Sequence, residues 1–189
     1  MTRWWWLRMT VGVAQDDEDV MVRRKVDSST LSSSVRIVAT PETVWHNITN
    51  VRIDASVPPR LFTLLGIPKP LHAELFDEPP ERRRVAYFSN GKRFSQEITS
   101  WRPLESYAFT FRADGGFKVA FVLDLSRGPF RLVGGEYHMM QNGSGIELTL
   151  TSTYVVEGLM RPFSIPIAIV MRAFQRYLLS AIKTSCEER

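Results

Sequence analysis

The spacing of apolar residues changes twice along this chain and divides it into three kinds of element. From Val44 to Val51 apolar side chains recur at helical spacing, and from Leu71 to about Glu157 they alternate with polar ones. Alternation with a period of two is typical of strands with one buried face. From about Ile165 to Glu187 helical spacing returns over a longer stretch. The pattern predicts a strand-rich middle between a short and a long helical region.

The first elements follow from local signals. Residues 34–39 alternate as a first strand, and Thr40-Pro41-Glu42 after it combines a capping side chain, a proline suited to the first helical turn and an acid at a helix N-terminus. We expect this helix to end near Asn50. A second short helix is predicted over 58–65, where Gly66 ends it.

A hairpin is predicted at Asn90-Gly91, the strongest short-range hairpin signal. A two-residue loop would pair Tyr87 with Phe94 and Val85 with Gln96 on one face. It would place Ser89 opposite Lys92, Phe88 opposite Arg93 and Arg84 opposite Glu97. The first face would then be largely apolar, and the other would have a cross-strand ion pair.

The remaining strands are separated by turn residues. One is expected around Tyr107, Phe109 and Phe111, and the next around residues 117–125. Asn142 to Gly145 would connect the last two strands. In that hairpin the alternation places Tyr137 and Met139 on the face of Ile146, Leu148 and Leu150, and His138 with Glu147 on the opposite face.

The last helix has an apolar stripe made by Phe163, Ile167, Val170, Phe174, Leu178 and Ala181. A long apolar helix needs a large concave surface to cover it, and a twisted antiparallel sheet of six to seven strands supplies one. The predicted fold class is therefore α+β. A curved antiparallel sheet wraps the C-terminal helix around a cavity, with two short helices after the first strand.

Composition fits a single globular domain. The 189 residues are 44% hydrophobic and 23% charged, and the net charge of +4 is mild. The basic residues are scattered apart from Arg82-Arg83-Arg84, so no nucleic-acid partner is expected. No stretch reaches the roughly 18–20 consecutive apolar residues of a membrane span. A cytoplasmic location is compatible with the single Cys186.

The N-terminal segment reads differently from the rest. Residues 1–30 are expected to be an extension or linker, and the domain to cover 31–187. Trp4, Trp5 and Trp6 lie between arginines, a pattern suited to a membrane interface. Three alternatives to a membrane contact remain for this segment. It could be a hydrophobic flap on the domain, an oligomer contact, or translated sequence upstream of a true start at Met21. The oligomeric state stays open.

Searches for catalytic or metal-binding motifs find none. The three histidines and the single cysteine lack metal-site spacing, and there is neither a nucleophile elbow nor a phosphate loop. We therefore expect no metal and no cofactor. His72 and Glu74 would share one strand face, where an acid–base pair is conceivable but a solvated face is favoured. The catalytic residues, if any, are not identified.

Polar side chains on the apolar face are the stronger candidates. Buried hydroxyl and amide groups need hydrogen-bond partners, which a ligand, the backbone or water can supply. With their apolar neighbours they form the candidate ligand-binding set: Tyr87, Phe94, Gln96, Ile98, Phe109, Tyr137, Leu148, Ser152, Tyr154 and Phe174.

Two segments carry a family resemblance. Residues 35–45, VRIVATPETVW, and residues 143–154, GSGIELTLTSTY, resemble the opening strand and helix and the last strand of the SRPBCC superfamily, also called START-like or birch-pollen-allergen-like. Ile182-Lys183 is similar to the end of its terminal helix. The resemblance covers roughly residues 31–187 and is strongest to the polyketide cyclase/dehydrase and lipid-transport group. It implies a hydrophobic-ligand cavity between sheet and helix, without implying one chemistry.

These observations lead to three functional hypotheses. The favoured one is a non-catalytic protein that binds a lipid, an isoprenoid or a polycyclic aromatic molecule. The second is a cyclase/dehydrase-like enzyme, which a His or carboxylate with a shifted pKa in the cavity would favour. The third is a membrane-surface or partner-binding protein that uses Trp4, Trp5 and Trp6.

Overall fold

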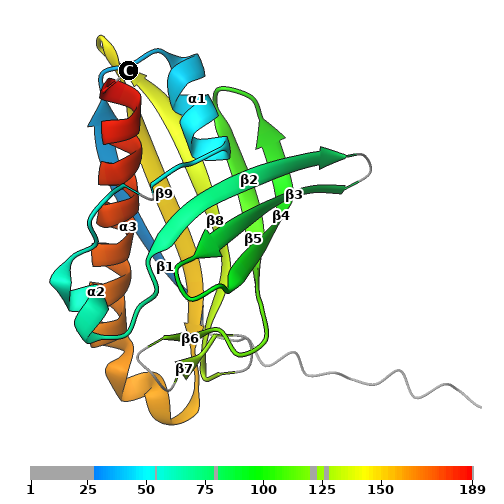
Figure 1. Cartoon of the computed structure of the whole chain (residues 1–189), viewed down its shortest axis with the longest axis vertical. Helices are drawn as coiled ribbons and strands as arrows, with labels where there is room; N and C mark the ends of the chain where they lie inside the picture. The colour runs from blue at the N-terminus through cyan, green and yellow to red at the C-terminus, as the bar shows by residue number, and fades with distance from the viewer. Residues whose placement is uncertain (1–27, 54, 79–80, 120–122, 126–127, 189) are drawn as a thin grey trace, which may run out of the picture.

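A seven-stranded antiparallel sheet curves around one long helix in the computed structural model of this chain (Figure 1). The structure describes residues 28–53, 55–78, 81–119, 123–125 and 128–188. The strand order is β1-β9-β8-β5-β4-β3-β2. The first strand of the chain therefore pairs with the last and forms one edge of the sheet. The α+β helix-grip fold expected from the sequence is confirmed.

The sheet is built mainly from consecutive hairpins. Its strands are β1 (Ser28–Ile37), β2 (Pro70–Glu78), β3 (Glu81–Phe88), β4 (Arg93–Arg102), β5 (Ser106–Ala113), β8 (Phe130–Asn142) and β9 (Gly145–Val156). β1 begins at Ser28, inside the segment expected to be an extension. The β2–β3 hairpin reaches away from the long helix (Figure 1).

The helices lie on the concave face of the sheet (Figure 1). They are α1 (Pro41–Thr49), α2 (Arg60–Leu64), the 3-10 helix η1 (Gly158–Phe163) and α3 (Ser164–Glu187). α1 begins as predicted: the Thr40 hydroxyl accepts a hydrogen bond from the Thr43 N–H, and Pro41 occupies the first turn. The three helices predicted from the sequence all form.

The main core lies at the α1 end of the sheet. Ile37, Val44, Ile48, Leu148 and Ile182 are almost completely excluded from solvent and belong to one apolar cluster. Helix α3 makes its most extensive contacts with β1, followed by α1. Burial of apolar surface stabilises a fold by about 25 cal/mol per Å². This cluster is therefore the main source of stability.

Gln175 attaches the middle of α3 to the sheet. Its side chain is only 1% exposed. The amide Nε2 donates to the Leu31 carbonyl at 2.9 Å, the Leu150 carbonyl at 3.2 Å and the Ser152 hydroxyl at 2.9 Å, while Oε1 accepts from the Ser33 hydroxyl. One side chain thus bonds β1 and β9 at the same point. The helix is fixed over that pair of strands.

The predicted register of the β3–β4 hairpin is wrong by one residue. Tyr87 pairs with Arg93, and Ala86 pairs with Phe94. The hairpin closes on Phe88 and Lys92, with Gly91 at φ +75° in the loop, so the loop has three residues. Ser89 bonds to Lys69 instead of crossing to Lys92.

The shift reverses the two faces of β3 and leaves β4 as predicted. Arg84 and Phe88 are therefore on the concave face, and Tyr87 is on the convex face. The predicted pairing of Arg84 with Glu97 does not occur, since Arg83 stands opposite Glu97.

The segment predicted as one strand over 117–125 is not part of the main sheet. It forms a separate two-stranded sheet from β6 (Lys118–Val119) and β7 (Leu123–Asp124), in which Val119 pairs with Leu123. Phe117 and Leu125 are buried in an apolar cluster with Phe88 and Phe130. The apolar–polar alternation in the sequence of this segment therefore arises from the burial of Phe117 and Leu125 in that cluster, and not from a strand of the main sheet. The assignment of faces predicted for β8 and β9 is confirmed, with Tyr137 opposite Leu150 and His138 opposite Thr149.

The stretch Gly158–Glu187 is the one helical segment among the described residues that is long and apolar enough to cross a membrane, with a mean hydropathy of 1.3 over its best window. Length and composition alone support that reading. In the fold, the sheet wraps around α3, and Gln175 and Ile182 are buried on one side of this helix. The core helix of a soluble domain passes the same test but is mostly buried, whereas 22% of this apolar window is buried.

Replacing Gln175 by leucine should destabilise the fold by about 2–4 kcal/mol, because hydroxyl and carbonyl groups on β1 and β9 lose their buried partner. Urea unfolding measures this. Arg176→Gln, at the next and exposed position, is the control and should change stability by less than about 0.5 kcal/mol. A Gln175→Leu protein as stable as the parent would contradict the role of Gln175 as an attachment point.

Candidate functional site

A cavity of about 410 Å³ lies between α3 and the half of the sheet that the helix does not cover closely. This volume is within the range of about 300–1,000 Å³ found for small-molecule sites. Residues from α3 form one wall, and residues from β3, β4, β5 and β8 form the other.

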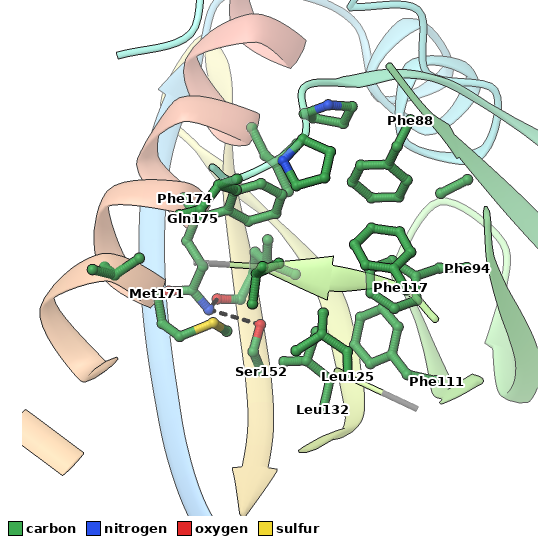
Figure 2. Close-up of a pocket in the computed structure, with 18 of the residues that line it drawn as sticks. Phe88, Phe94, Phe111, Phe117, Leu125, Leu132, Ser152, Met171, Phe174 and Gln175 are labelled. Carbon is green, nitrogen blue, oxygen red and sulfur yellow. Dashed lines mark hydrogen bonds between the residues drawn. The ribbon is translucent and has the colours of Figure 1, made fainter. Parts of the chain in front are cut away.

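Aromatic rings make most of the sheet-side wall (Figure 2). Phe94 stacks on Phe117 with ring centroids 4.4 Å apart, and Phe88 meets Phe117 edge-on at 4.9 Å. Phe111 contacts Phe94 edge-on. Met171 and Phe174 face these rings from α3. This aromatic cluster (Phe88, Phe94, Phe111, Phe117) gives the cavity an apolar, polarisable surface.

The polar groups of the wall are few. Among the described residues that line the cavity they are His72, Arg84, Gln96, Tyr137, Ser152 and Gln175. Ser152 and Gln175 bond to each other (Figure 2) and belong to the attachment of α3. An apolar space with a few fixed polar points is the usual form of a small-molecule site, because the polar points orient the ligand.

Arg84 is the one cation in this described wall and is only 4% exposed. Its Nε donates to the Thr49 carbonyl at the end of α1 at 3.1 Å, and its Nη1 donates to Gln96 Oε1 at 2.8 Å. These bonds hold the guanidinium beside the C-terminal end of α1. A buried charge held in this way keeps a fixed position.

Two buried tyrosines near Arg84 differ in their hydrogen bonding. The Tyr107 hydroxyl donates to the Ile48 carbonyl at 2.8 Å and is part of the core. The Tyr137 hydroxyl lines the cavity and has no hydrogen-bond partner among the described residues. Burial raises the pKa of both phenols, and the nearby Arg84 cation opposes this only in part. Tyr137 therefore stays protonated at neutral pH and can donate to a ligand.

The cavity reaches the surface at its other end. Phe163 in η1 lines the cavity and is also 53% exposed. Met160 and Pro166, on either side of Phe163 in the chain, line the same end. η1 and α1 lie at opposite ends of α3 (Figure 1). The cavity thus runs from an opening at η1 towards the polar group at α1.

The structure brings together six of the ten predicted site residues. Those that line the cavity are Phe94, Gln96, Phe109, Tyr137, Ser152 and Phe174. Leu148 is fully buried in the core, Ile98 packs beside that core, and Tyr154 packs on Phe130. Tyr87 lies on the convex face and stacks on His72 at 4.6 Å, so the register error explains its misplacement.

Arg84 and Gln175 are two polar wall residues that sequence reasoning missed, and Phe88, Phe111 and Phe117 of the aromatic cluster were not among the predicted site residues either. Arg84 stands in a run of three arginines, which suggested a solvated edge, and the predicted register placed it outside. The available signal was that Arg84, Ala86 and Phe88 are every second residue of one strand and therefore share a face. Gln175 lies on the apolar side of α3 between Met171 and Leu179, and a lone amide there is a signal for a buried attachment.

The histidine pairs considered above are on the surface. His72 Nε2 lies 3.7 Å from Glu74 Oε1, and both side chains are substantially exposed. His138 is exposed on the convex face, and Glu147 accepts a hydrogen bond from Asn142. Neither pair points to an acid–base site in the cavity.

Comparison with known proteins gives matches at the level of structure alone. No family model and no curated protein sequence matches the chain. The Zhui aromatase/cyclase from a Streptomyces species superposes with a TM-score of 0.55 at 14% identity, covering 86% of this chain and 96% of that one. Ara h 8.0201 superposes with a TM-score of 0.54 at 12% identity, covering 86% of this chain and 100% of that one.

Protein MLL2253 from Mesorhizobium loti is a third similar structure, with a TM-score of 0.51 at 14% identity over 85% of this chain and 98% of that one. At such low identity these likenesses establish the fold and no activity. The chain has the same helix-grip fold as these proteins, the fold that the sequence resemblance implied.

Truncating Phe117 to alanine should cost about 3–5 kcal/mol of stability, because this ring fills the space between Phe88 and Phe94. Thermal or urea unfolding measures the loss. Phe163→Ala, at the exposed end of the cavity, is the matched control, with an expected loss below about 1 kcal/mol. Equal losses in the two variants would mean that the β6–β7 hairpin is not packed into the aromatic cluster.

Proposed function

We propose that this protein binds a hydrophobic small molecule in the cavity between α3 and the sheet. The observation that carries the proposal is a 410 Å³ space lined by aromatic and aliphatic side chains, with a few fixed polar groups at one end. Native cores are close-packed, so a space of this size costs stability unless something occupies it. A lipid, an isoprenoid or a polycyclic aromatic molecule fits the chemistry of the wall.

Filling the cavity should prevent binding. Ala86 lines it from β3, and Ala86→Phe places a ring in the open space. We expect at least about a tenfold loss of affinity for N-phenylnaphthylamine, a neutral fluorescent ligand, since ligand and ring would compete for one volume. Ala108→Phe, the same change on the convex face of β5, should keep the affinity of the parent.

If the parent protein yields no copurifying ligand in native mass spectrometry and does not bind N-phenylnaphthylamine, the cavity is not a ligand site. Equal affinities of the two phenylalanine variants would place the ligand elsewhere.

A cyclase/dehydrase-like enzyme is the alternative reading of the same cavity. The described wall contains neither Asp nor Glu, and its single histidine, His72, stacks on Tyr87 beside Glu74. Chemistry on a carbonyl substrate would then depend on Tyr137 as a proton donor and Arg84 as a cation. These groups can polarise a carbonyl but supply no general base. Binding without turnover is therefore the favoured function.

Exposed apolar residues around the opening favour a second role, contact with a membrane surface. Leu159 is 93% exposed, and Phe163, Ile165 and Ile169 are each more than half exposed. This apolar rim (Leu159, Phe163, Ile165, Ile169) lies in a stretch, 158–186, that has no acidic residue and contains Arg161 and Arg172. Apolar side chains beside basic ones suit the interface of an anionic bilayer.

The rim should bind anionic vesicles in preference to neutral ones. Leu159→Glu with Ile165→Glu should abolish cosedimentation with vesicles that contain about a third phosphatidylserine. Val133→Glu with Met140→Glu, which adds the same charge to exposed apolar positions of β8, is the control and should retain it.

Trp4, Trp5 and Trp6 lie outside the described residues, so deletion of residues 1–13 tests their contribution separately. Cosedimentation that depends on this deletion and not on the rim variants would transfer the membrane contact to the tryptophans.

A further inference from the structure

The guanidinium of Arg84 is buried without a countercharge. Among the described residues it forms no ion pair, none of the buried polar side chains is acidic, and no acid lines the cavity. Its two partners, the Thr49 carbonyl and the Gln96 amide, are neutral. A buried unpaired cation is costly, and side chains of this kind are normally paired or neutralised.

The hydrogen-bonding capacity left at this end of the cavity is almost entirely that of donors. Gln96 directs Oε1 to Arg84, so its Nε2 is left to donate. Nη2 of Arg84, Nε2 of Gln96 and the hydroxyl of Tyr137 have no acceptor among the described residues. All three side chains line the cavity, and each is at least nine-tenths buried.

The orientation of Gln96 cannot be reversed. A flipped amide would turn its NH₂ group towards the Arg84 Nη1 donor, which sits 2.8 Å from the present oxygen. Arg84 donates to the Thr49 carbonyl, and Tyr107 donates to the adjacent Ile48 carbonyl. The Tyr137 ring lies 5.3 Å from the Tyr107 ring, which places it on the same side of the cavity as Arg84. The donors thus occupy one neighbourhood, where a positive charge is fixed.

We propose that the ligand is an amphipathic carboxylate, bound with its acid group on Arg84, Gln96 and Tyr137 and its apolar body along the aromatic cluster. This rests on the proposed function, since it specifies the ligand of the same cavity. An ionised carboxylate is acceptor-only and matches the fork of a guanidinium. Because Arg84 is at the α1 end and the opening is at η1, the acid enters first and the apolar body follows it.

Matched acid and neutral ligands test this proposal. Dodecanoate is compared with dodecanol, and naphthylacetate with naphthylethanol, by displacement of N-phenylnaphthylamine at neutral pH. In the parent protein we expect at least one acid to bind about tenfold or more tightly than its alcohol, as charge-assisted hydrogen bonds of this type allow. Arg84→Met should remove that preference and change the alcohol affinity by less than about threefold.

Arg83→Met is the matched control. It removes the neighbouring arginine, which is exposed on the convex face over the Phe76 ring, and should leave the preference for the acid unchanged. Tyr137→Phe and Gln96→Met each remove one donor and keep the cation. Each should reduce the acid preference partially, by about three- to tenfold. These two variants decide the question if Arg84→Met does not fold.

Stability gives a separate readout. Ligand-free Arg84→Met should be about as stable as the parent, since removal of an unpaired buried ion offsets the loss of the hydrogen bonds to the Thr49 carbonyl and Gln96. Dodecanoate or naphthylacetate should raise the melting temperature of the parent and not that of Arg84→Met.

The possible failures are distinguishable. Alcohols that bind as well as acids, or an acid preference that survives Arg84→Met, would overturn the carboxylate site and leave the apolar cavity intact. A large loss of stability in Arg84→Met with an unchanged preference would make Arg84 a structural brace between α1 and β4. No displacement or probe binding at all would refute the proposed function itself.

Discussion

The cavity depends on where α3 is attached to the sheet. Gln175 bonds to β1 and β9 together, and the apolar cluster around Leu148 and Ile182 packs the C-terminal half of the helix on the same strands. The sheet has seven strands, and a single helix cannot cover all of them closely. Attachment at one side leaves the concave surface of β3, β4 and β5 facing open space. The cavity is the consequence of this asymmetric attachment.

Curvature of the sheet determines the shape of that space. The ladder is interrupted between Ile98 and Ser100 in β4 and between Leu132 and Gly134 in β8, and such bulges bend and twist strands. Gly135 lies against the Phe109 ring, where an added Cβ would come within 2.9 Å of the ring. The absence of a side chain there lets the ring lie flat on the bend. The bulges in β4 and β8 and the glycine at this position thus contribute to the curvature of the sheet.

Sequence patterns predicted the elements because their signals are local. The Thr40 cap, the alternation in β9 and the stripe on α3 each depend on neighbouring residues, and all three elements form. The β3–β4 register depends on a contact outside the hairpin, the bonds of Ser89 to Lys69, and was wrong by one residue. That single residue exchanged Tyr87 for Arg84 at the cavity. Arg84 was therefore beyond local reasoning. Gln96 and Tyr137 at the polar end, and Phe94, Phe109 and Phe174 in the apolar wall, were predicted from the alternation and the helical stripe.

Arg84 also shows how stability and specificity diverge in this fold. An apolar residue at its position would extend the row formed by Ala86 and Phe88 and would avoid desolvating a cation. The guanidinium does brace the end of α1 through the Thr49 carbonyl, but a neutral donor could do the same without the charge. The charge itself is unused by the described protein groups. A cost that the fold does not require is expected at a functional site. Here the uncompensated charge favours an anion at the α1 end of an apolar cavity.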